Sequence, residues 1–214
     1  ADETRESGAF TAIALKGGID LLVRPGAREA VQVGGDDNLL ALVRTAVQTR
    51  DGVRTLHIDI EPGVSILGRH RLLVTVDVMR LLAIESKGSG DIRVAGLATP
   101  SLSLSISGSS DAKLERLDTG TLSVDIAGSG DVDAEGRASR LDIAVAGSGT
   151  VRARALSADD VSVSIAGSGD AVVQAARTLA VSIAGSGSVE YSGAAQITRS
   201  AVAGSGWIRQ RRQI

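Results

Sequence analysis

A short signature, Gly-Ser-Gly, returns at a nearly constant interval through the last two thirds of the chain. Six copies begin at Gly88, Gly128, Gly147, Gly167, Gly185 and Gly204, and a seventh, Gly108-Ser109-Ser110, lacks the second glycine. Successive copies therefore start about 20 residues apart throughout, which lies within the range of known repeat proteins. A fixed period of this length is typical of solenoids, whose repeats bury their apolar faces only by stacking on one another.

Apolar residues alternate with small polar residues in front of each signature. Before Gly108 the apolar positions are Leu102, Leu104 and Ile106, and the later copies keep this pattern. A period of two is typical of a strand with one buried face. A second, shorter alternation follows each signature, as at Val132 and Ala134. Each repeat therefore supplies two strands joined by a glycine corner.

These features predict an all-β chain folded as a single-stranded parallel β-helix of about seven rungs, each about 20 residues long. An antiparallel barrel is a weaker alternative, because it would need tight hairpins at half this period. Glycine suits the corners because it adopts positive φ without steric cost. The predicted corner residues are Gly88, Gly90, Gly108, Gly128, Gly130, Gly147, Gly149, Gly167, Gly169, Gly185, Gly187, Gly204 and Gly206.

The composition agrees with a thin, ring-free core. Hydrophobic residues make up 43% of the 214 residues, but the chain has only one Phe, one Trp and one Tyr. Val, Ile, Leu and Ala must therefore fill the interior. We expect Trp207, in the last repeat, to cap the open end of this core.

Charge and composition exclude several classes of protein. The 23 basic and 25 acidic residues nearly balance, and the only basic cluster is Arg209, Arg211 and Arg212, so no nucleic-acid partner is expected. No apolar run approaches the roughly 18 residues of a transmembrane segment. The absence of cysteine excludes disulfides and thiol chemistry. Because the chain begins at Ala1 rather than Met, we expect that a leader is absent from this sequence.

The outward positions of the longer predicted strand carry small side chains. This candidate binding or interface face consists of Ser103, Ser105, Ser123, Asp125, Ser162, Ser164 and Ser182, with alanines between them. It could pack against another element or a second subunit, or it could bind a glycan or a cell-surface partner. The shorter strand exposes charged residues such as Lys113 and Arg152, which predicts a solvated face.

Aspartates recur directly after the glycine corners. Asp91, Asp111 and Asp131 stand at equivalent positions in consecutive repeats, and Asp170 repeats the pattern later. Stacked carboxylates repel one another, so these three could bind a cation such as Ca²⁺. The interpretation that we favour is that each aspartate accepts a hydrogen bond from the backbone of its own turn.

The N-terminal third lacks the repeat but is also rich in strand patterns. We divide the chain into a tail (1–8), a β-rich region that caps or extends the helix (9–81), the β-helix repeats (82–209) and a C-terminal tail (210–214). Asp36 or Asp37 could begin one short helix over residues 38–42. Asp51-Gly52 is a favoured turn dipeptide between two strand-like segments, residues 43–48 and 53–60.

The sequence resembles the head GIN domain family of proposed autotransporter adhesins. The resemblance rests on Phe10, on Gly18-Ile19-Asp20-Leu21, on residues 31–40, on Asp51-Gly52 with Leu56-His57-Ile58, and on the Gly-Ser-Gly-Asp repeats. It covers about residues 8–209. It implies a right-handed β-helix and a bacterial, extracytoplasmic location in the periplasm, on the outer-membrane surface or outside the cell. The family has no established activity, so the resemblance assigns no catalytic or binding residue.

No motif for catalysis or for a cofactor occurs. The two histidines, His57 and His70, have no nucleophile motif near them, and no Gly-rich pattern has the third glycine and the helix of a nucleotide site. We therefore expect a non-enzymatic adhesin or envelope scaffold that binds through its flat faces and needs no cofactor. The alternatives are a polysaccharide lyase or hydrolase on a β-helix, which the scarcity of aromatic residues disfavours, and a Ca²⁺-stabilised structural module.

Overall fold

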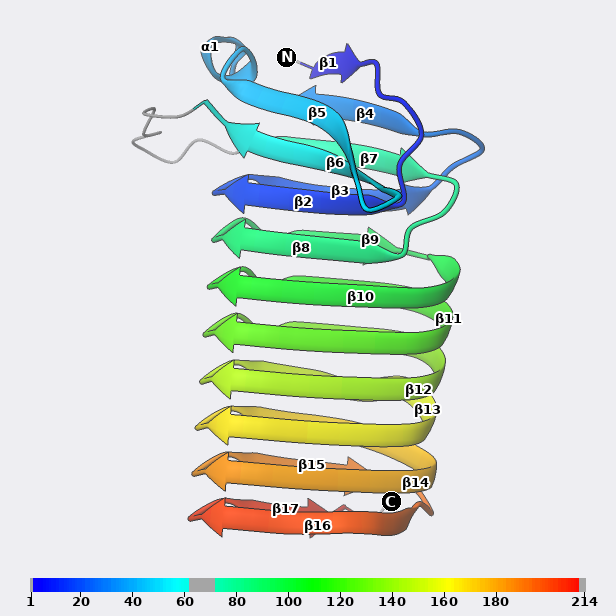
Figure 1. The fold of residues 1–214 in the computed structure, drawn as a ribbon, viewed down its shortest axis with the longest axis vertical. Helices are drawn as coiled ribbons and strands as arrows, with labels where there is room; N and C mark the ends of the chain where they lie inside the picture. Colours follow the sequence, from blue (N-terminus) through cyan, green and yellow to red (C-terminus); the bar gives the residue numbers. More distant parts are fainter. Residues whose placement is uncertain (1, 62–71, 212–214) are drawn as a thin grey trace.

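The fold is all-β and coils as a parallel β-helix, as the repeat predicts. The computed structural model describes residues 2–61 and 72–211. Their seventeen strands join in one continuous sheet (Figure 1). The N-terminal elements are β1 (Asp2–Arg5), β2 (Ala12–Gly17), β3 (Asp20–Pro25), β4 (Ala30–Gly34), α1 (Asp37–Leu40), β5 (Val43–Arg50), β6 (Val53–Ile60) and β7 (Leu73–Val78). The repeats form β8 (Ala83–Gly88), β9 (Ile92–Ala95), β10 (Ala98–Gly108), β11 (Ala112–Gly128), β12 (Val132–Gly147), β13 (Thr150–Gly167), β14 (Asp170–Gly185), β15 (Ser188–Ser192), β16 (Gln196–Gly204) and β17 (Trp207–Gln210).

Each repeat stacks in register on the next. Gly108 lies beside Gly128, Gly128 beside Gly147, and so on to Gly185 beside Gly204, all in parallel pairing. In Figure 1 the chain descends while it runs right to left in front and left to right behind, which makes the coil right-handed. The solenoid has about six turns, because the seven corners of the sequence bound six complete intervals.

The period-two pattern separates interior from surface as predicted. Leu102, Leu104 and Ile106 are at most 1% exposed, whereas Ser103 between them lies on the outside. One apolar cluster runs along the stack from Phe10 to Tyr191, and the partly buried Ile208 of the last turn packs against it. Aliphatic side chains fill each layer, so the interior between the sheets needs no aromatic rings.

Both glycines of a corner are required by the rung above. At Gly167 φ is +128°, and a Cβ there would lie 2.4 Å from the carbonyl oxygen of Gly147. At Gly169 a Cβ would lie 2.5 Å from the carbonyl oxygen of Gly149 and 2.7 Å from Cγ1 of Val145. Stacking at strand spacing leaves no room for a side chain at either position.

The one degenerate corner has a matching change in the rung above it. Ser110 replaces the second glycine and is completely buried. The inner position next to it holds Ser86, which pairs in register with Ile106, where later rungs have Ile or Val. The two hydroxyl oxygens lie 2.9 Å apart and hydrogen-bond to each other. A small polar residue at 86 therefore provides both the space and the partner that Ser110 needs.

The N-terminal strands continue the stack out of sequence order. β2 and β3 form the rung directly above β8 and β9, and Gly17 pairs with Gly88 although the two are far apart in the sequence. β6 and β7 lie in parallel above β2 and β3. β2 is therefore inserted between two strands that come later in the chain. The boundary that we place at residue 82 remains a prediction, since parallel pairing crosses it.

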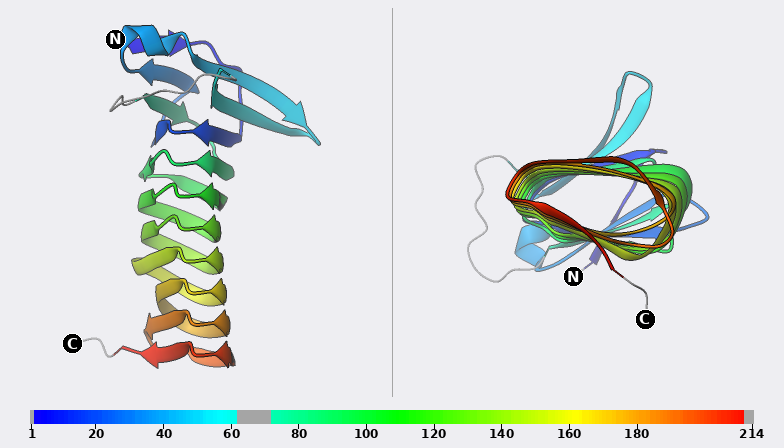
Figure 2. Two further views of the ribbon diagram at one scale, coloured as in Figure 1. Left: turned by 90° about the vertical axis from the view of Figure 1, so that its left-hand side faces the viewer. Right: turned by 90° about the horizontal axis from the view of Figure 1, so that it is seen from below.

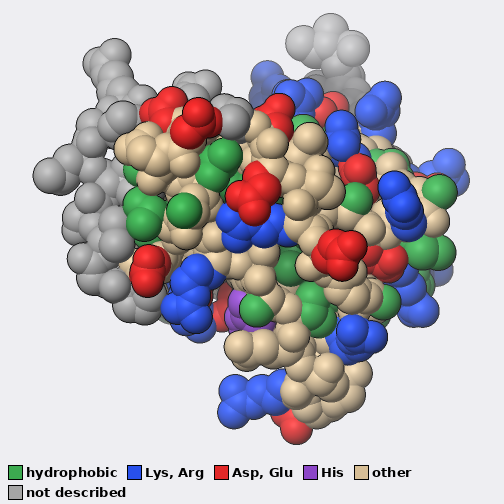
Figure 3. Space-filling model, turned by 90° about the horizontal axis from the view of Figure 1, so that it is seen from above, with side chains coloured by type: hydrophobic (Ala, Val, Ile, Leu, Met, Phe, Trp, Pro, Cys, Tyr) green, Lys and Arg blue, Asp and Glu red, His purple; other side chains and the backbone are tan. Residues whose placement is uncertain are grey.

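Antiparallel strands and a short helix close the N-terminal end. β5 pairs antiparallel with β6, and β4 pairs antiparallel with β7 and β1. The helix begins after Asp36, which is one of the two candidate N-cap residues, and it buries Leu39 and Leu40. Arg5 donates hydrogen bonds to the carbonyl oxygens of Leu40 (2.8 Å) and Val43 (2.5 Å). Seen from above, this end presents interspersed acidic and basic side chains (Figure 3).

The β5–β6 hairpin projects away from the solenoid. Asp51 and Gly52 both have positive φ, +51° and +78°, as the two-residue turn requires. Figure 2 shows the hairpin leaning out over one broad side of the coil, the side that faces the viewer in Figure 1. The flat side of the solenoid and the projecting hairpin therefore meet at a concave angle.

Candidate functional site

The broad side beneath the hairpin is the face that the sequence predicted to carry small side chains. We call it the front face and define it as the outward side chains of the segments that precede each glycine corner in β10 to β14, together with those of β2 and β8. One column runs from Ser105 through Asp125, Ala144 and Ser164 to Ser182, each residue in register with the next. The structure brings together on this face all the predicted residues: Ser103, Ser105, Ser123, Asp125, Ser162, Ser164 and Ser182. The surface is nearly flat because no side chain in this column is longer than aspartate.

A shallow depression marks the middle of the front face. It has a volume of about 300 Å³, and Ser105, Asp125, Ala144, Ala146 and Ser164 line it. Its base is formed by the alanines, which leave the backbone of the strands close to the surface. A ligand here would meet serine hydroxyls, one carboxylate and methyl groups.

The upper border of the front face is polar and was not predicted as a site. The column of Ser105 continues upward through Glu85, Ala14 and His57, which are paired in register. Where the wall meets the hairpin, a pocket of about 440 Å³ is lined by Ala14, Gln48, Thr49, Arg50, Thr55, His57 and Glu85. We call it the corner pocket. The sequence carries no signal for it, because its walls come from three segments that are far apart in the chain.

Ion pairs fix one end of the front face. Asp160 accepts hydrogen bonds from Arg177, whose Nε lies 3.0 Å from Oδ1, and from the hydroxyl of Thr178 at 2.6 Å. The pKa of Asp160 is lowered to about 2, mainly by the hydrogen bonds from Arg177 and next by the hydrogen bond from Thr178. Nearby, Arg140 pairs with Asp142 at 2.8 Å. These charges are therefore neutralised beside Ser162 rather than left open for a ligand.

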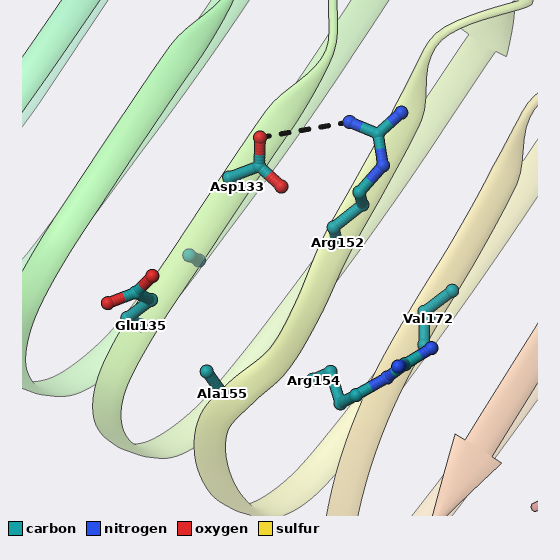
Figure 4. A pocket seen from close by; sticks show the side chains of 7 residues that line it. Asp133, Glu135, Arg152, Arg154, Ala155 and Val172 are labelled. Atoms are coloured by element: carbon teal, nitrogen blue, oxygen red, sulfur yellow. Dashed lines mark ion pairs between the residues drawn. The ribbon is translucent and has the colours of Figure 1, made fainter.

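The opposite face, formed by the segments that follow each glycine corner, is an ion-paired surface. Its shallow groove of about 360 Å³ contains Asp133, Glu135, Arg152 and Arg154 (Figure 4). Arg152 lies 2.9 Å from Asp131 and 3.7 Å from Asp133, and Arg154 lies 3.8 Å from Glu190. These contacts fit the solvated face that the sequence indicates.

A second set of ion pairs on this face involves Glu115. Its carboxylate pairs with Lys113 at 2.8 Å and with Arg93 at 2.9 Å. The hydrogen bond from Lys113 is the largest cause of a lowered pKa at Glu115, and Arg93 adds to it. The same contact raises the pKa of Lys113. Both groups therefore stay charged and paired at neutral pH.

The aspartate ladder joins neighbouring rungs. Asp111 accepts a hydrogen bond from the backbone N–H of Asp131 (2.9 Å), and Asp131 accepts one from Thr150 (3.0 Å). Asp20 likewise accepts a hydrogen bond from the backbone N–H of Asp91, and Asp170 accepts one from the backbone N–H of Ser188. For Asp111, Asp131 and Asp170 the donor belongs to the next rung and not to the aspartate's own turn, which corrects the favoured interpretation.

Metal binding at Asp91, Asp111 and Asp131 receives no support from their geometry. Within residues 2–61 and 72–211 no group of three or more His, Cys, Asp or Glu side chains could hold a metal ion. Asp131 also pairs with Arg152, and this guanidinium occupies the oxygen that a cation would need.

Trp207 does not cap the core. It pairs with Ser188, which pairs with Asp170, so it occupies the outward aspartate column. The side chain is 44% exposed, and the guanidinium carbon of Arg209 lies 4.9 Å from the centre of its ring. The expected lid was wrong because Ile208, the next residue, continues the inward column of the buried Val189, and strand alternation then turns the indole outward.

No catalytic arrangement appears among the described residues. His57 lies in β6 at the base of the hairpin, and His70 falls outside the described part of the chain. The groove that contains acids holds them beside arginines, and no aromatic side chain lines it. The front face can therefore contribute hydrogen bonds and a complementary surface to a ligand.

Comparison with known proteins agrees with this fold. The family described as "Putative auto-transporter adhesin, head GIN domain" matches residues 9–195. The chain belongs to this family. No curated protein matches the sequence. The adhesin description suggests an extracellular or surface location, and no helix in the described part of the chain is long and apolar enough to cross a membrane.

Several solved structures have a similar fold. A putative adhesin from Bacteroides fragilis is 26% identical with a TM-score of 0.86. A putative lipid binding protein from Parabacteroides distasonis and a putative adhesin from Parabacteroides merdae are each 21% identical, with TM-scores of 0.77 and 0.75. In all three the match covers 99% of this chain and 96% of the other. This head GIN domain protein therefore shares its whole fold, including the N-terminal end, with these structures.

Proposed function

We propose that this head GIN domain protein is a non-enzymatic, extracytoplasmic adhesin or envelope scaffold that binds its partner through the front face. The observation that carries the proposal is the continuous column of Ser, Ala and Asp side chains below an overhanging hairpin. Stacking alone does not demand such uniformly small residues on the solvent side, since the opposite face of the same coil is rich in Arg, Lys and Glu.

The physical chemistry of this surface favours a broad and shallow contact. Ser and Ala side chains lose little or no rotamer freedom when they are covered, so ordering them on binding costs little. Their short reach lets a partner approach the strand backbone closely, and each serine hydroxyl both donates and accepts hydrogen bonds. A glycan or a cell-surface protein with hydroxyl and amide groups suits such a face. The corner pocket adds His57, Glu85 and Arg50 as longer-reaching polar groups at its upper border.

The ion-paired groove on the opposite face supports a non-enzymatic role. Hydrolysis of a glycosidic bond needs two carboxyl groups that flank the bond to be cleaved. Here Asp133 instead pairs with Arg152, 3.7 Å away, and Glu190 pairs with Arg154, 3.8 Å away. Release of product from an acidic polysaccharide by the purified protein would instead favour a lyase or hydrolase.

The front face can be tested by blocking it with long charged side chains. In a Ser164→Arg, Ser182→Arg variant, two guanidinium groups stand out from the column of small residues. We expect this variant to lose capture of the envelope partner that the wild type retains in a pull-down from envelope extract. Ser139→Arg, Ser157→Arg is the matched control, because both serines are exposed on the adjacent strands β12 and β13, between the back and front segments of those strands. Equal capture by all three proteins, each with native thermal unfolding, would refute the proposed face.

The proposed location has its own test. Production of the full-length gene product in its native host, followed by cell fractionation, should place the protein in the envelope or medium fraction. Recovery with cytoplasmic markers would contradict the extracytoplasmic part of the proposal and leave the front-face test unaffected.

A further inference from the structure

The corner pocket is built where the hairpin turns away from the front face. Its lining consists of Gln48, Thr49 and Arg50 of β5, Thr55 and His57 of β6, Ala14 of β2 and Glu85 of β8. Ala14 pairs in register with His57 above it and with Glu85 below it. Its methyl group leaves a gap between these two longer side chains, and the hairpin overhangs the gap (Figure 2). The resulting recess of about 440 Å³ falls within the range of about 300 to 1,000 Å³ that is typical of small-molecule sites.

The polar side chains of this pocket are not used by the fold. In the part of the chain that the structure describes, Arg50 forms no ion pair, and the side chains of Gln48 and His57 form no hydrogen bond. Arg44, on the same face of β5, instead lies 4.0 Å from Asp59. The pocket therefore presents a guanidinium, an amide and an imidazole that are all available to a ligand.

Arg50 gives the pocket one uncompensated positive charge. The only carboxylate among the described lining residues belongs to Glu85, and its Oε1 lies 2.7 Å from Nζ of Lys87. Asp51, which follows Arg50 at the turn, does not line the pocket and makes no ion pair with it in the described structure. Lys16, in register with Lys87, adds a further positive charge at the border. The local potential therefore favours an anion, and the Glu85 carboxylate disfavours one with two negative charges.

We propose that the corner pocket binds one acidic sugar residue, a pyranose ring that carries a single carboxylate. The forked guanidinium of Arg50 matches a planar carboxylate, to which it can donate two parallel hydrogen bonds. The amide of Gln48, the hydroxyl of Thr55 and the imidazole of His57 offer donors and acceptors for the ring hydroxyls. An apolar ligand would instead cover these groups without replacing their hydrogen bonds to water, because Ala14 is the only apolar residue of the described lining.

The inference deepens the proposed function, because it rests on a glycan as the partner and places one residue of that glycan at the upper border of the front face. The described lining contains no Phe, Tyr or Trp, so the ring is held without aromatic stacking and a single sugar should bind weakly. A glycan that continues from the pocket down the front face would add contacts and raise the overall affinity.

Nuclear magnetic resonance titration of the purified protein with small sugars tests the pocket directly. The acidic probes are glucuronate, galacturonate and N-acetylneuraminate; glucose is the neutral counterpart of glucuronate, and acetate is a carboxylate without hydroxyl groups. We expect at least one acidic sugar to shift the ring signals of His57, which a His57→Gln variant identifies, and to bind at least about tenfold more tightly than glucose or acetate. The indole signal of Trp207 in β17, at the opposite end of the solenoid, should not move (Figure 1).

Three outcomes of this titration would overturn the proposal. The first is that no acidic sugar shifts the His57 signals. The second is equal binding of glucose, which would show that Arg50 holds no carboxylate. The third is equal binding of acetate, which would indicate an adventitious anion only.

Two arginine variants of the hairpin decide whether the pocket holds the carboxylate. Arg50→Gln should weaken binding of the tightest acidic sugar by at least about tenfold. Arg54→Gln is the matched control, because Arg54 is an exposed arginine of the same hairpin that pairs with Thr49 but does not line the pocket. Its affinity should stay within about twofold of wild type. Equal losses in the two variants would indicate unspecific attraction of anions and would overturn the proposal.

The sugar titration and the front-face pull-down fail separately. The titration uses purified protein and free sugars, whereas the pull-down compares serine variants several rungs below the pocket. If none of the acidic sugars binds, the pocket proposal is refuted even when the front-face variant loses its envelope partner. If an acidic sugar binds and Arg50→Gln abolishes that binding, the pocket proposal stands even when the front-face variant captures its partner normally.

Discussion

The two ends of the solenoid differ more than any other pair of regions in the molecule. At the N-terminal end the parallel stack is closed by antiparallel β4 and β5, by Leu39 and Leu40 of α1, and by Arg5. At the C-terminal end the last rung repeats the geometry of those above it, and its inward residues are exposed. A repeated sequence determines how each rung stacks on the next, but it does not determine where the stack ends. Termination needs a non-repeating sequence, which β4, α1 and β5 supply at the N-terminal end.

The largest expected difference comes from one substitution made near each end. A Cβ at Gly88 and a Cβ at Gly204 would both lie 2.2 Å from the carbonyl oxygen of the rung above. We expect Gly88→Ala to lower the free energy of unfolding by about 3 kcal/mol or more, because rungs on both sides hold it. Gly204→Ala should cost only about 1 kcal/mol, since the last rung can open locally.

Urea unfolding of the two glycine variants, followed by circular dichroism, measures this difference. The hairpin variant Gly52→Ala is a control for backbone strain alone, because φ is +78° there and nothing lies within 4 Å of the added Cβ. Equal losses at positions 88 and 204 would show that the C-terminal end is as firmly held as the N-terminal end.

A truncation of one apolar side chain at each end should give the next largest contrast. Leu40→Ala removes a side chain that is 8% exposed and opens a cavity beneath α1, for a loss of about 2 to 3 kcal/mol. Val202→Ala, at 42% exposure, should stay within about 0.5 kcal/mol in dilute protein. Thermal unfolding at low concentration compares the two variants without any contribution from association. A larger loss at Val202 than at Leu40 would reverse the contrast.

A smaller effect is expected where the stack departs from its own pattern. Ser86→Ile puts a branched side chain beside the buried Ser110, so overpacking should cost about 1 to 2 kcal/mol. In Ser86→Ile, Ser110→Gly the rung regains the arrangement of the later turns, and most of this loss should be recovered. A double-mutant cycle in urea measures the coupling. Additive losses would mean that the two serines are independent.

The smallest expected effect is pH-dependent and lies away from both ends. Because the pKa of Asp160 falls to about 2 in the folded protein, its pairing with Arg177 stabilises the fold fully above the unfolded pKa near 3.8. That contribution disappears as pH falls through about 2. Asp160→Asn should therefore be slightly less stable than wild type at pH 6, and the difference should shrink toward pH 2. A difference that grows on acidification would contradict this assignment.

The sequence was sufficient for the turns that repeat. Strand alternation before Gly108 and the intervals between glycines predicted the coil, its corners and the outward serines, because stacking imposes the same demands on every rung. The family resemblance predicted its right-handed sense. The same reasoning could not find the rung of β2 and β3. Its corner, Gly17-Gly18, pairs with Gly88 across several periods of chain and so lies outside the repeat.

What depends on three-dimensional neighbours was not predictable. Ser86 and Ser110 make sense only together, because each supplies the space and the hydrogen bond that the other needs. The donors to Asp111, Asp131 and Asp170 come from the next rung, which a single repeat does not show. The corner pocket joins the hairpin to β2 and β8. The outward position of Trp207, by contrast, was within reach of the sequence, because the alternation already places its neighbour Ile208 inward.

The out-of-order rung has a consequence for the way the chain acquires its structure. Contacts within the repeats span about one period, so closing each loop costs little entropy and these rungs can form quickly. The pairing of β2 is completed later, because its partners β6 and β8 lie far downstream in the sequence. A chain that emerges N-terminus first therefore holds Ile13 and Leu15 exposed until Gly88 has followed. The strands that are synthesised first are therefore among the last to gain all their pairing partners.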